Sequence, residues 1–128
     1  MTTRRAVVTG ASSGIGEAVV RALRASGWDV VGVARRAERL AALDAEVGSR
    51  SFAADLTSEA DVAALAAHVA STGDVHALVH VAGGARGTDR VEDGSPEDWR
   101  WMFEANVLST QLVTAALLPL LRGGIRAG

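Results

Sequence analysis

The chain has 128 residues, 48% of them hydrophobic, a formal net charge of −2 at pH 7 and no cysteine. This length predicts a single globular domain, residues 1–128, that can bury roughly two-thirds of its unfolded surface. The absence of cysteine excludes disulfides and thiolate metal sites and is typical of a reducing cytoplasm, and the charge gives no support to nucleic-acid binding. The longest apolar run, 112–121, is far short of the roughly 20 residues that a membrane span needs, and the N-terminal run is too short for a signal peptide.

Short β-branched runs alternate with helical patterns along the chain, which is typical of a parallel sheet covered by helices. We expect strands near residues 5–9, 29–34, 50–54 and 77–81. We expect helices near residues 14–26, 37–47 and 58–71, and a last helical segment from Ser95-Pro96 to Leu121. This last segment is expected to bend near Asn106 and to end at Gly123-Gly124. Right-handed crossovers then predict a Rossmann-like, doubly wound α/β fold with strand order 3-2-1-4.

Apolar residues at 3.6-residue spacing predict the buried faces of the first two helices. In the first helix these residues are Ile15, Ala18, Val19, Ala22 and Leu23. In the second helix they are Leu40, Ala41 and Leu43.

The turn between the first strand and the first helix reads Thr9-Gly10-Ala11-Ser12-Ser13-Gly14-Ile15-Gly16. Closely spaced glycines at such a place allow a tight turn and let a ligand approach the backbone, and the free N–H groups of the helix N-terminus favour an anion. A phosphate loop of the Gly-Lys-Ser/Thr kind is excluded because the chain has no lysine. The turn therefore predicts dinucleotide binding, with a purely structural glycine turn as the alternative.

The chain resembles the short-chain dehydrogenase/reductase family at four landmarks that occur in the family's order. The turn at 9–16 matches the family's Thr-Gly-x-x-x-Gly-x-Gly residue for residue, and Asp55-Leu56 follows the third strand. His80-Val81-Ala82-Gly83 stands where the family usually has Asn-Asn-Ala-Gly, and Asn106-Val107 stands where the family has its catalytic Asn. The resemblance implies hydride transfer between nicotinamide C4 and the carbon of a small-molecule carbonyl or alcohol.

The resemblance also implies which residues hold the cofactor. The pyrophosphate side is assigned to Gly10, Ser12, Ser13, Gly14, Ile15 and Gly16. Asp55 and Leu56 are assigned to the adenine, with a simple turn residue as the alternative for Asp55, and Ala82 and Gly83 to the nicotinamide side. His80 is also assigned to the cofactor-binding residues. It stands where the family has a side chain that links neighbouring strands by hydrogen bonds. No metal site is predicted, because His68 and His76 show no ligand spacing with His80.

The end of the second strand distinguishes between the two nicotinamide cofactors. An NAD site needs an acidic residue here, about 20 residues beyond the glycines, to accept from the ribose 2′-OH. This chain has Ala34-Arg35-Arg36 and no acid before Glu38. Two guanidinium groups can bind the 2′-phosphate of NADP in a bidentate manner, so the sequence favours NADP(H) over NAD(H). A solvated basic start to the second helix is the alternative.

Asn106 lies inside a helical pattern, where asparagine is disfavoured because it competes for backbone hydrogen bonds. The resemblance implies a catalytic role for Asn106, which would hold a water that relays protons from the catalytic Lys. A solvent-facing or locally bonded Asn is the alternative. The nearby cluster of Trp99, Trp101, Met102 and Phe103 is either core or, as the resemblance implies, part of a homodimer interface.

The family's acid/base chemistry uses a Tyr, a Lys four residues on and a Ser that orients the substrate. This chain contains no Tyr and no Lys. We therefore expect a chain that is incomplete at its C-terminus, binds NADP(H) weakly and catalyses nothing by itself; a non-catalytic nucleotide-binding or subunit-pairing module is the alternative. The fourth strand is left as an exposed sheet edge, which together with the helices over 97–121 predicts self-association or a homo-oligomer.

Overall fold

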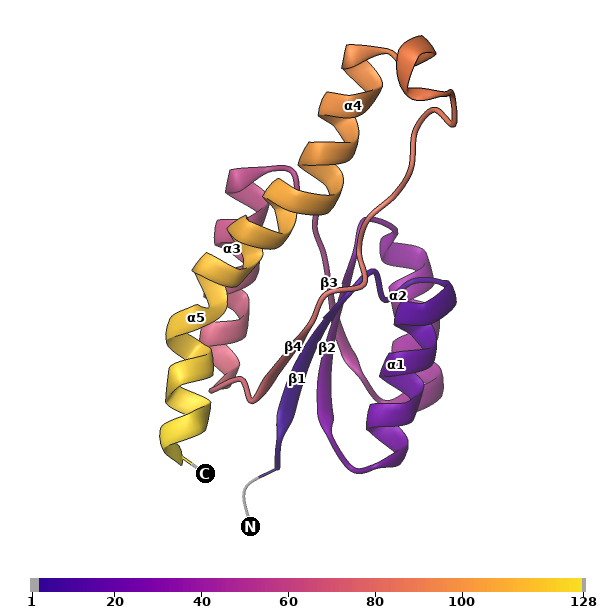
Figure 1. Ribbon diagram of the computed structural model, residues 1–128. Coiled ribbons are helices and arrows are strands. Elements are labelled where there is room, and N and C mark those ends of the chain that lie inside the picture. The colour runs from indigo at the N-terminus through magenta and orange to yellow at the C-terminus, as the bar shows by residue number, and fades with distance from the viewer. Residues whose placement is uncertain (1–2, 128) are drawn as a thin grey trace.

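The computed structural model describes residues 3–127 and places four parallel strands in one sheet (Figure 1). The strands are β1 (Arg5–Thr9), β2 (Asp29–Ala34), β3 (Arg50–Ala53) and β4 (Ala77–Val79). Their order is β3-β2-β1-β4, and the register aligns Val8 of β1 with Gly32 of β2 and Val79 of β4. The predicted Rossmann-like α/β sheet and its strand order are confirmed.

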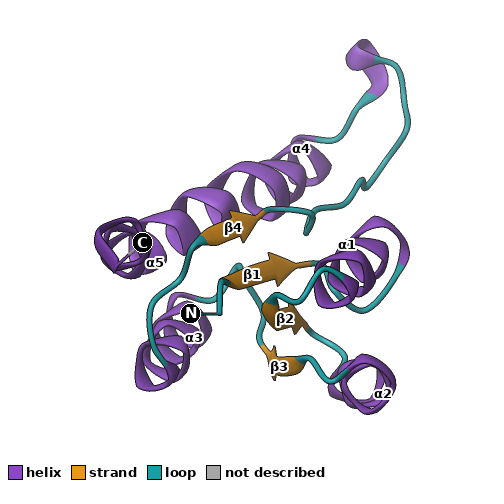
Figure 2. Cartoon of the chain, turned by 90° about the horizontal axis from the view of Figure 1, so that it is seen from below, coloured by secondary structure: helices purple, strands orange, loops and turns teal. Residues whose placement is uncertain are grey.

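Helices cover both faces of the sheet, as the view along the layers in Figure 2 shows. One face carries α1 (Gly14–Ala25) and α2 (Ala37–Val47), and the other carries α3 (Glu59–Thr72) and α5 (Ser109–Ala127). A short 3-10 turn, η1 (Val91–Asp93), precedes α4 (Pro96–Phe103), which continues into α5 through a π-helical turn, η2 (Glu104–Leu108). In Figure 1, α4 extends beyond the edge at which the strands end.

The core consists of two apolar clusters, one on each face of the sheet. Alternate residues of a strand point to opposite faces, so Val7 of β1 joins one cluster and Val8 joins the other. The α3 and α5 side buries Leu65, Val69, Val113 and Leu117. The α1 and α2 side buries Val20, Leu40 and Leu43. Burial on both faces explains the unbroken apolar runs of the central strands.

The buried helix faces differ in part from the prediction. The predicted inward residues that are exposed instead are Ile15, Ala18, Ala22 and Ala41. In α1 the sheet contact is made by Gly16 and Val20, because α1 packs on β1 and β2 and no described helix lies beside it on the β4 side (Figure 2). In α2 the buried stripe is narrow and consists of Leu40 and Leu43, which leaves Ala41 outside it.

The expectation that Gly123-Gly124 ends the last helix is wrong, since α5 runs to Ala127. The two glycines instead let the helix approach the segment before β4. A Cβ on Gly124 would collide with the backbone carbonyl of Val75, and a Cβ on Gly123 would meet the carboxylate of Asp74. The glycines are thus explained by close packing and not by helix termination.

Smaller differences concern strand and helix ends. The first and third helices end at Ala25 and Thr72, and the strands near 50–54 and 77–81 end at Ala53 and Val79. β4 stops early because the next free backbone N–H groups bond to a side chain instead of a strand carbonyl, as described below.

The apolar run of 112–121 is part of a longer continuous helix, Pro96–Arg126. By length and composition alone this helix could cross a membrane, and 22% of its most apolar window is buried inside the protein. Val113 and Leu117 on this helix are fully buried against the sheet. The helix is therefore longer than the segment predicted from the sequence, which ended at Leu121, and it packs as a helix that covers a sheet.

The packing of Gly124 gives a direct test. Gly124→Ala should lower the free energy of unfolding by more than about 1 kcal/mol, because the new methyl group meets a backbone atom that cannot move aside. Gly123→Ala is the matched control, since its methyl group meets only the mobile end of Asp74 and alanine favours a helix by about 1 kcal/mol. Urea unfolding followed by circular dichroism measures both; equal stability of the two variants would contradict this explanation.

Candidate functional site

The turn after β1 brings backbone segments closer together than side chains would allow. Gly10 has a φ of +68°, and a Cβ there would lie 2.8 Å from the backbone nitrogen of Ala82. A Cβ on Gly16 would collide with the carbonyl oxygen of Gly10. Gly14 faces open space but has a φ of +56°, a conformation that favours glycine. The three glycines of the predicted fingerprint therefore meet separate physical requirements.

Thr9 joins the end of β1 to the end of β4. Its side chain is fully buried, and its Oγ1 accepts hydrogen bonds from the backbone N–H groups of Val81 and Ala82, each at 3.1 Å. The sequence analysis assigned this residue no role of its own. The sequence feature that could have indicated this role is a polar, β-branched residue at the end of an otherwise apolar run.

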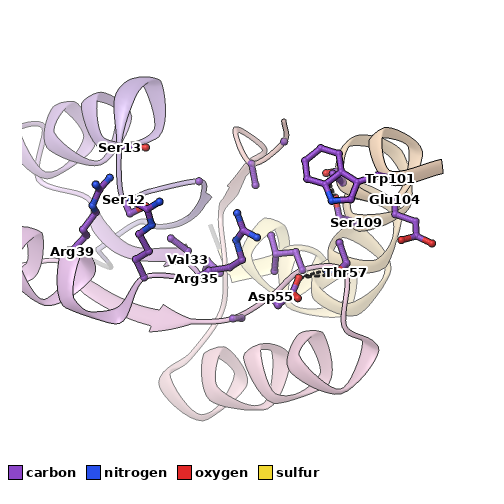
Figure 3. Close-up of a pocket in the computed structure, with 18 residues that line it drawn as sticks. Ser12, Ser13, Val33, Arg35, Arg39, Asp55, Thr57, Trp101, Glu104 and Ser109 are labelled. Atoms are coloured by element: carbon purple, nitrogen blue, oxygen red, sulfur yellow. Dashed lines mark hydrogen bonds between the residues drawn. The ribbon is translucent and has the colours of Figure 1, made fainter. Parts of the chain in front are cut away.

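A cleft of about 460 Å³ opens where the four strands end (Figure 3). Nine of the predicted cofactor-binding residues line it, namely Gly10, Ser12, Ser13, Arg35, Arg36, Asp55, Leu56, Ala82 and Gly83. The opposite wall comes from the helical segment that follows the loop after β4, through Trp101, Glu104, Ala105 and Ser109. These four residues were not predicted from the sequence to line a cleft. The carboxyl ends of parallel strands are where such sheets bind their ligands.

Some predicted residues lie outside this lining. Gly16 is buried beneath the turn, and Gly14 lines a smaller hollow next to the cleft. Ile15 is 73% exposed and lies outside the lining of the cleft and of the hollow. The structure therefore divides the turn into a part that faces the cleft, Gly10, Ser12 and Ser13, and a part that positions the first turn of α1.

His80 is also outside the cleft lining. Its Nε2 lies 2.9 Å from Oγ1 of Thr114, so it links the end of β4 to α5 and not to a neighbouring strand as expected. Burial lowers the pKa of the His80 imidazole, which favours the neutral ring at neutral pH. This side chain fastens a helix to the sheet.

Asn106 lies in the π-helical turn η2, so the regular α-helix is interrupted at the residue where a bend was predicted. Its Oδ1 accepts from the backbone N–H of Gly84 at 2.9 Å, and its Nδ2 donates to the carbonyl oxygens of Gly84 at 2.8 Å and Met102 at 2.9 Å. A Cβ on Gly83 would collide with the same side chain. Asn106 therefore holds the loop after β4 against the helix that follows it, which is the local bonding of the alternative interpretation.

Three arginines lie along one side of the cleft. Arg35 and Arg36 follow β2, line the cleft and are exposed. Arg39, on α2, also lines the cleft and was not predicted from the sequence; the available signal was a third arginine soon after Arg35 and Arg36. None of the three forms an ion pair with a side chain in the described part of the chain.

Asp55 supplies a negative charge at the end of β3. Its carboxylate accepts from Oγ1 of Thr57 at 2.7 Å and from the backbone N–H of Thr57 at 3.0 Å. These hydrogen bonds, with a smaller contribution from the charge of Arg35, lower the pKa of Asp55. The backbone N–H of Asp55 donates to Asp61 at 2.8 Å, so the N-terminus of α3 positions it. Asp55 is ionised at neutral pH and can accept a hydrogen bond from a ligand in the cleft.

The family model for short chain dehydrogenases matches residues 4–127. The chain belongs to the short-chain dehydrogenase family. It is 53% identical over 118 residues to an uncharacterized oxidoreductase of Mycobacterium tuberculosis, covering 92% of this chain and 46% of that protein. It is 42% identical over 118 residues to a serine 3-dehydrogenase of Agrobacterium fabrum, covering 90% of this chain and 47% of that protein. The chain spans about half the length of the curated relatives it matches.

Solved structures give the same result. A short-chain dehydrogenase from Streptomyces avermitilis is similar with a TM-score of 0.89 and 35% identity, over 96% of this chain and 46% of that one. A metagenomic short-chain oxidoreductase in complex with NADP is similar with a TM-score of 0.86 and 33% identity, over 94% of this chain and 57% of that one. The oxidoreductase family and the Rossmann-like fold are therefore shown for this chain.

The role of Thr9 can be tested by removing its hydroxyl. Thr9→Val keeps the shape of the side chain but leaves two backbone N–H groups without an acceptor, so we expect the free energy of unfolding to fall by about 1–3 kcal/mol. Thr9→Ser keeps the acceptor and should lose less. Chemical unfolding of the three proteins decides the matter, and a Thr9→Val protein as stable as wild type would refute the link between β1 and β4.

Proposed function

We propose that the cleft binds NADP(H) and that this chain is the cofactor-binding portion of a cytoplasmic oxidoreductase for a small carbonyl or alcohol substrate. The observation that carries the proposal is the pair Arg35-Arg36 at the end of β2, on the rim of the cleft that begins at the glycine turn. An NAD-type acid is absent there, since no Asp or Glu stands between Ala34 and Glu38. The 35% identical relative from Salmonella typhimurium is named an NADP-dependent 3-hydroxy acid dehydrogenase, which supports the same choice.

The residues present fit such a cofactor. The close packing of Gly10 and Gly16 leaves the backbone of the turn open to a pyrophosphate next to the N-terminus of α1. In the proposal Ser12 and Ser13 lie on the pyrophosphate side, Arg35 and Arg36 bind the 2′-phosphate, and Asp55 and Leu56 contact the adenine. Ala82 and Gly83 lie toward the nicotinamide half, with His80 and Asn106 holding that wall in place.

NADP(H), when bound, supplies hydride exchange at nicotinamide C4. The Tyr and Lys that the family uses for acid/base chemistry do not occur in these 128 residues. We therefore propose that the chain by itself binds the cofactor and does not turn over a substrate, and that turnover belongs to a longer protein. Asn106 would contribute the proton-relay water of the family only in that context.

Cofactor titration tests the proposal. NADPH fluorescence or calorimetry should show NADPH binding at least about tenfold more tightly than NADH, because a charged hydrogen bond to the 2′-phosphate contributes about 1.5–3 kcal/mol. Arg35→Ala should weaken NADPH binding about tenfold and leave NADH unchanged. Equal affinity for both cofactors would refute the NADP preference, and carbonyl reduction by the purified chain would refute its inactivity.

A second function is favoured by the exposed side of α4 and η2. Trp99, Phe103 and Val107 recur every four residues along this helical segment and are 54%, 56% and 52% exposed. β4 also lies at one edge of the sheet among the described strands. We propose that this apolar helical face, together with the β4 edge, joins copies of the chain into a homo-oligomer.

Sedimentation analysis of a charge variant tests the oligomer. Wild type should sediment as a dimer or larger species, and Phe103→Glu should shift it to a monomer because a carboxylate cannot be buried in an apolar contact. Arg122→Glu, on α5 and outside the apolar residues named above, is the control and should leave the assembly intact. A monomeric wild type at micromolar concentration would contradict the proposal.

A further inference from the structure

Trp101 lines the cleft but has no role in the proposed function. It shares one wall with Ala105 and Ser109, and the three residues recur every four positions along α4, η2 and α5. Trp99 and Phe103, two residues before and after Trp101, are outside the cleft lining and more than half exposed. The aromatic cluster noted in the sequence therefore divides between two surfaces, and Trp101 faces the cleft.

The indole ring of Trp101 is held in a fixed position beside the loop after β4. Trp101 is half-buried, and a Cβ on Gly84 would lie 3.0 Å from Cη2 of the indole, so the ring packs directly on the Gly84 backbone. The N–H and carbonyl groups of Gly84 both bond to the side chain of Asn106, at 2.9 Å and 2.8 Å. Asn106 belongs to the same helical segment as Trp101, so loop, ring and helix support one another. A ligand in the cleft thus meets a ring whose position is already ordered.

The wall around Trp101 offers little to a phosphate group. Ala105 has no polar side-chain atom, and the Ser109 hydroxyl is buried and donates to the carbonyl oxygen of Ala105 at 2.7 Å. Glu104, which also lines this wall, is exposed and its carboxylate repels an anion. The wall instead suits the uncharged face of a planar ring, which can lie against the indole.

Figure 3 shows which end of the cleft this wall belongs to. Trp101 lies at the end that holds Thr57, and Ser12 and Ser13 lie at the opposite end, with Arg35 between the two ends. A nucleotide whose phosphates lie toward the glycine turn and Arg35 therefore has its base beside Trp101.

We infer that Trp101 is a stacking surface for the adenine base and a positioning residue of the cleft. This inference rests on the proposed function and adds to Asp55 and Leu56 a side chain from the opposite wall. An indole presents a large, rigid π face, and a base that stacks on such a face binds more tightly without any contribution from charge. Trp101 therefore contributes equally to nucleotides with and without the 2′-phosphate, whereas Arg35 contributes only to those that carry it.

The experiment measures the binding of 2′,5′-ADP and 5′-ADP, which both carry adenine and lack nicotinamide, by calorimetry on the full 128-residue chain. Trp101→Leu should weaken the binding of both ligands about tenfold, because the stacking face is lost. Trp101→Phe keeps a smaller face and should give intermediate values. Trp99→Leu makes the same change two residues away, outside the cleft lining, and should alter neither affinity. Circular dichroism of each variant checks that the fold is retained.

Tryptophan fluorescence separates direct stacking from a supporting role. An indole stacked on a purine loses fluorescence, so 2′,5′-ADP should quench the emission of wild type and of Trp99→Leu. The same ligand at saturation should quench Trp101→Phe much less, although Trp28 and Trp99 are still present. Quenching that persists in Trp101→Phe would contradict direct stacking.

The two ligands also separate this inference from the proposed function. If Trp101→Leu binds both nucleotides as tightly as wild type does, the inference is overturned and the proposed function stands. If wild type binds both nucleotides equally and Trp101→Leu weakens both, the NADP preference is overturned and the stacking surface is supported. A wild type that binds neither nucleotide overturns the proposed function and this inference together.

Discussion

The ends of β1 and β4 meet at a distance that excludes a side chain, and the rest of the cleft depends on this contact. Gly10 packs on the backbone of Ala82, and the hydroxyl of Thr9 binds the N–H groups that would otherwise continue β4. The strand therefore ends at Val79, and the chain turns away to form the loop after β4. Asn106 then ties that loop to the helix on the far side of the cleft. Thr9 and Gly10 thus fix the place where the loop after β4 leaves the sheet beside the glycine turn.

Charge is distributed unevenly around this cleft. Arginines follow β2 and continue along α2, whereas Asp55 lies just after the end of β3. The pKa of Asp55 is lowered mainly by the hydrogen bond that it accepts from the Thr57 hydroxyl. An elongated ligand with phosphate near the arginines and a hydrogen-bond donor near Asp55 matches this arrangement. Arg35, Arg36 and Arg39 form no ion pair within residues 3–127, so the positive side of the cleft is available to that phosphate.

The parts of the fold that local residues decide were predictable from the sequence. The predicted and observed bounds agree to the residue for β2 (Asp29–Ala34) and for α2 (Ala37–Val47). The β-branched run of β2 and the C-cap Gly48 of α2 are local signals that mark where these elements lie. The prediction that Gly123-Gly124 ends the last helix was wrong, since a glycine pair in sequence looks the same whether it ends a helix or packs closely against another backbone segment. Arg39 and Trp101 were missed for a related reason: their place in the cleft depends on how a helix is oriented against the sheet.

The central claim is that a dinucleotide lies over the turn where β1 meets β4. Backbone amide shifts of the isotopically labelled chain during titration with NADPH test it most directly. The account predicts the largest changes at residues that line the cleft, namely Gly10, Ser12, Ser13, Arg35, Arg36, Asp55, Leu56, Ala82 and Gly83. Changes confined to the exposed side of α4 and η2, with the turn unaffected, would contradict it.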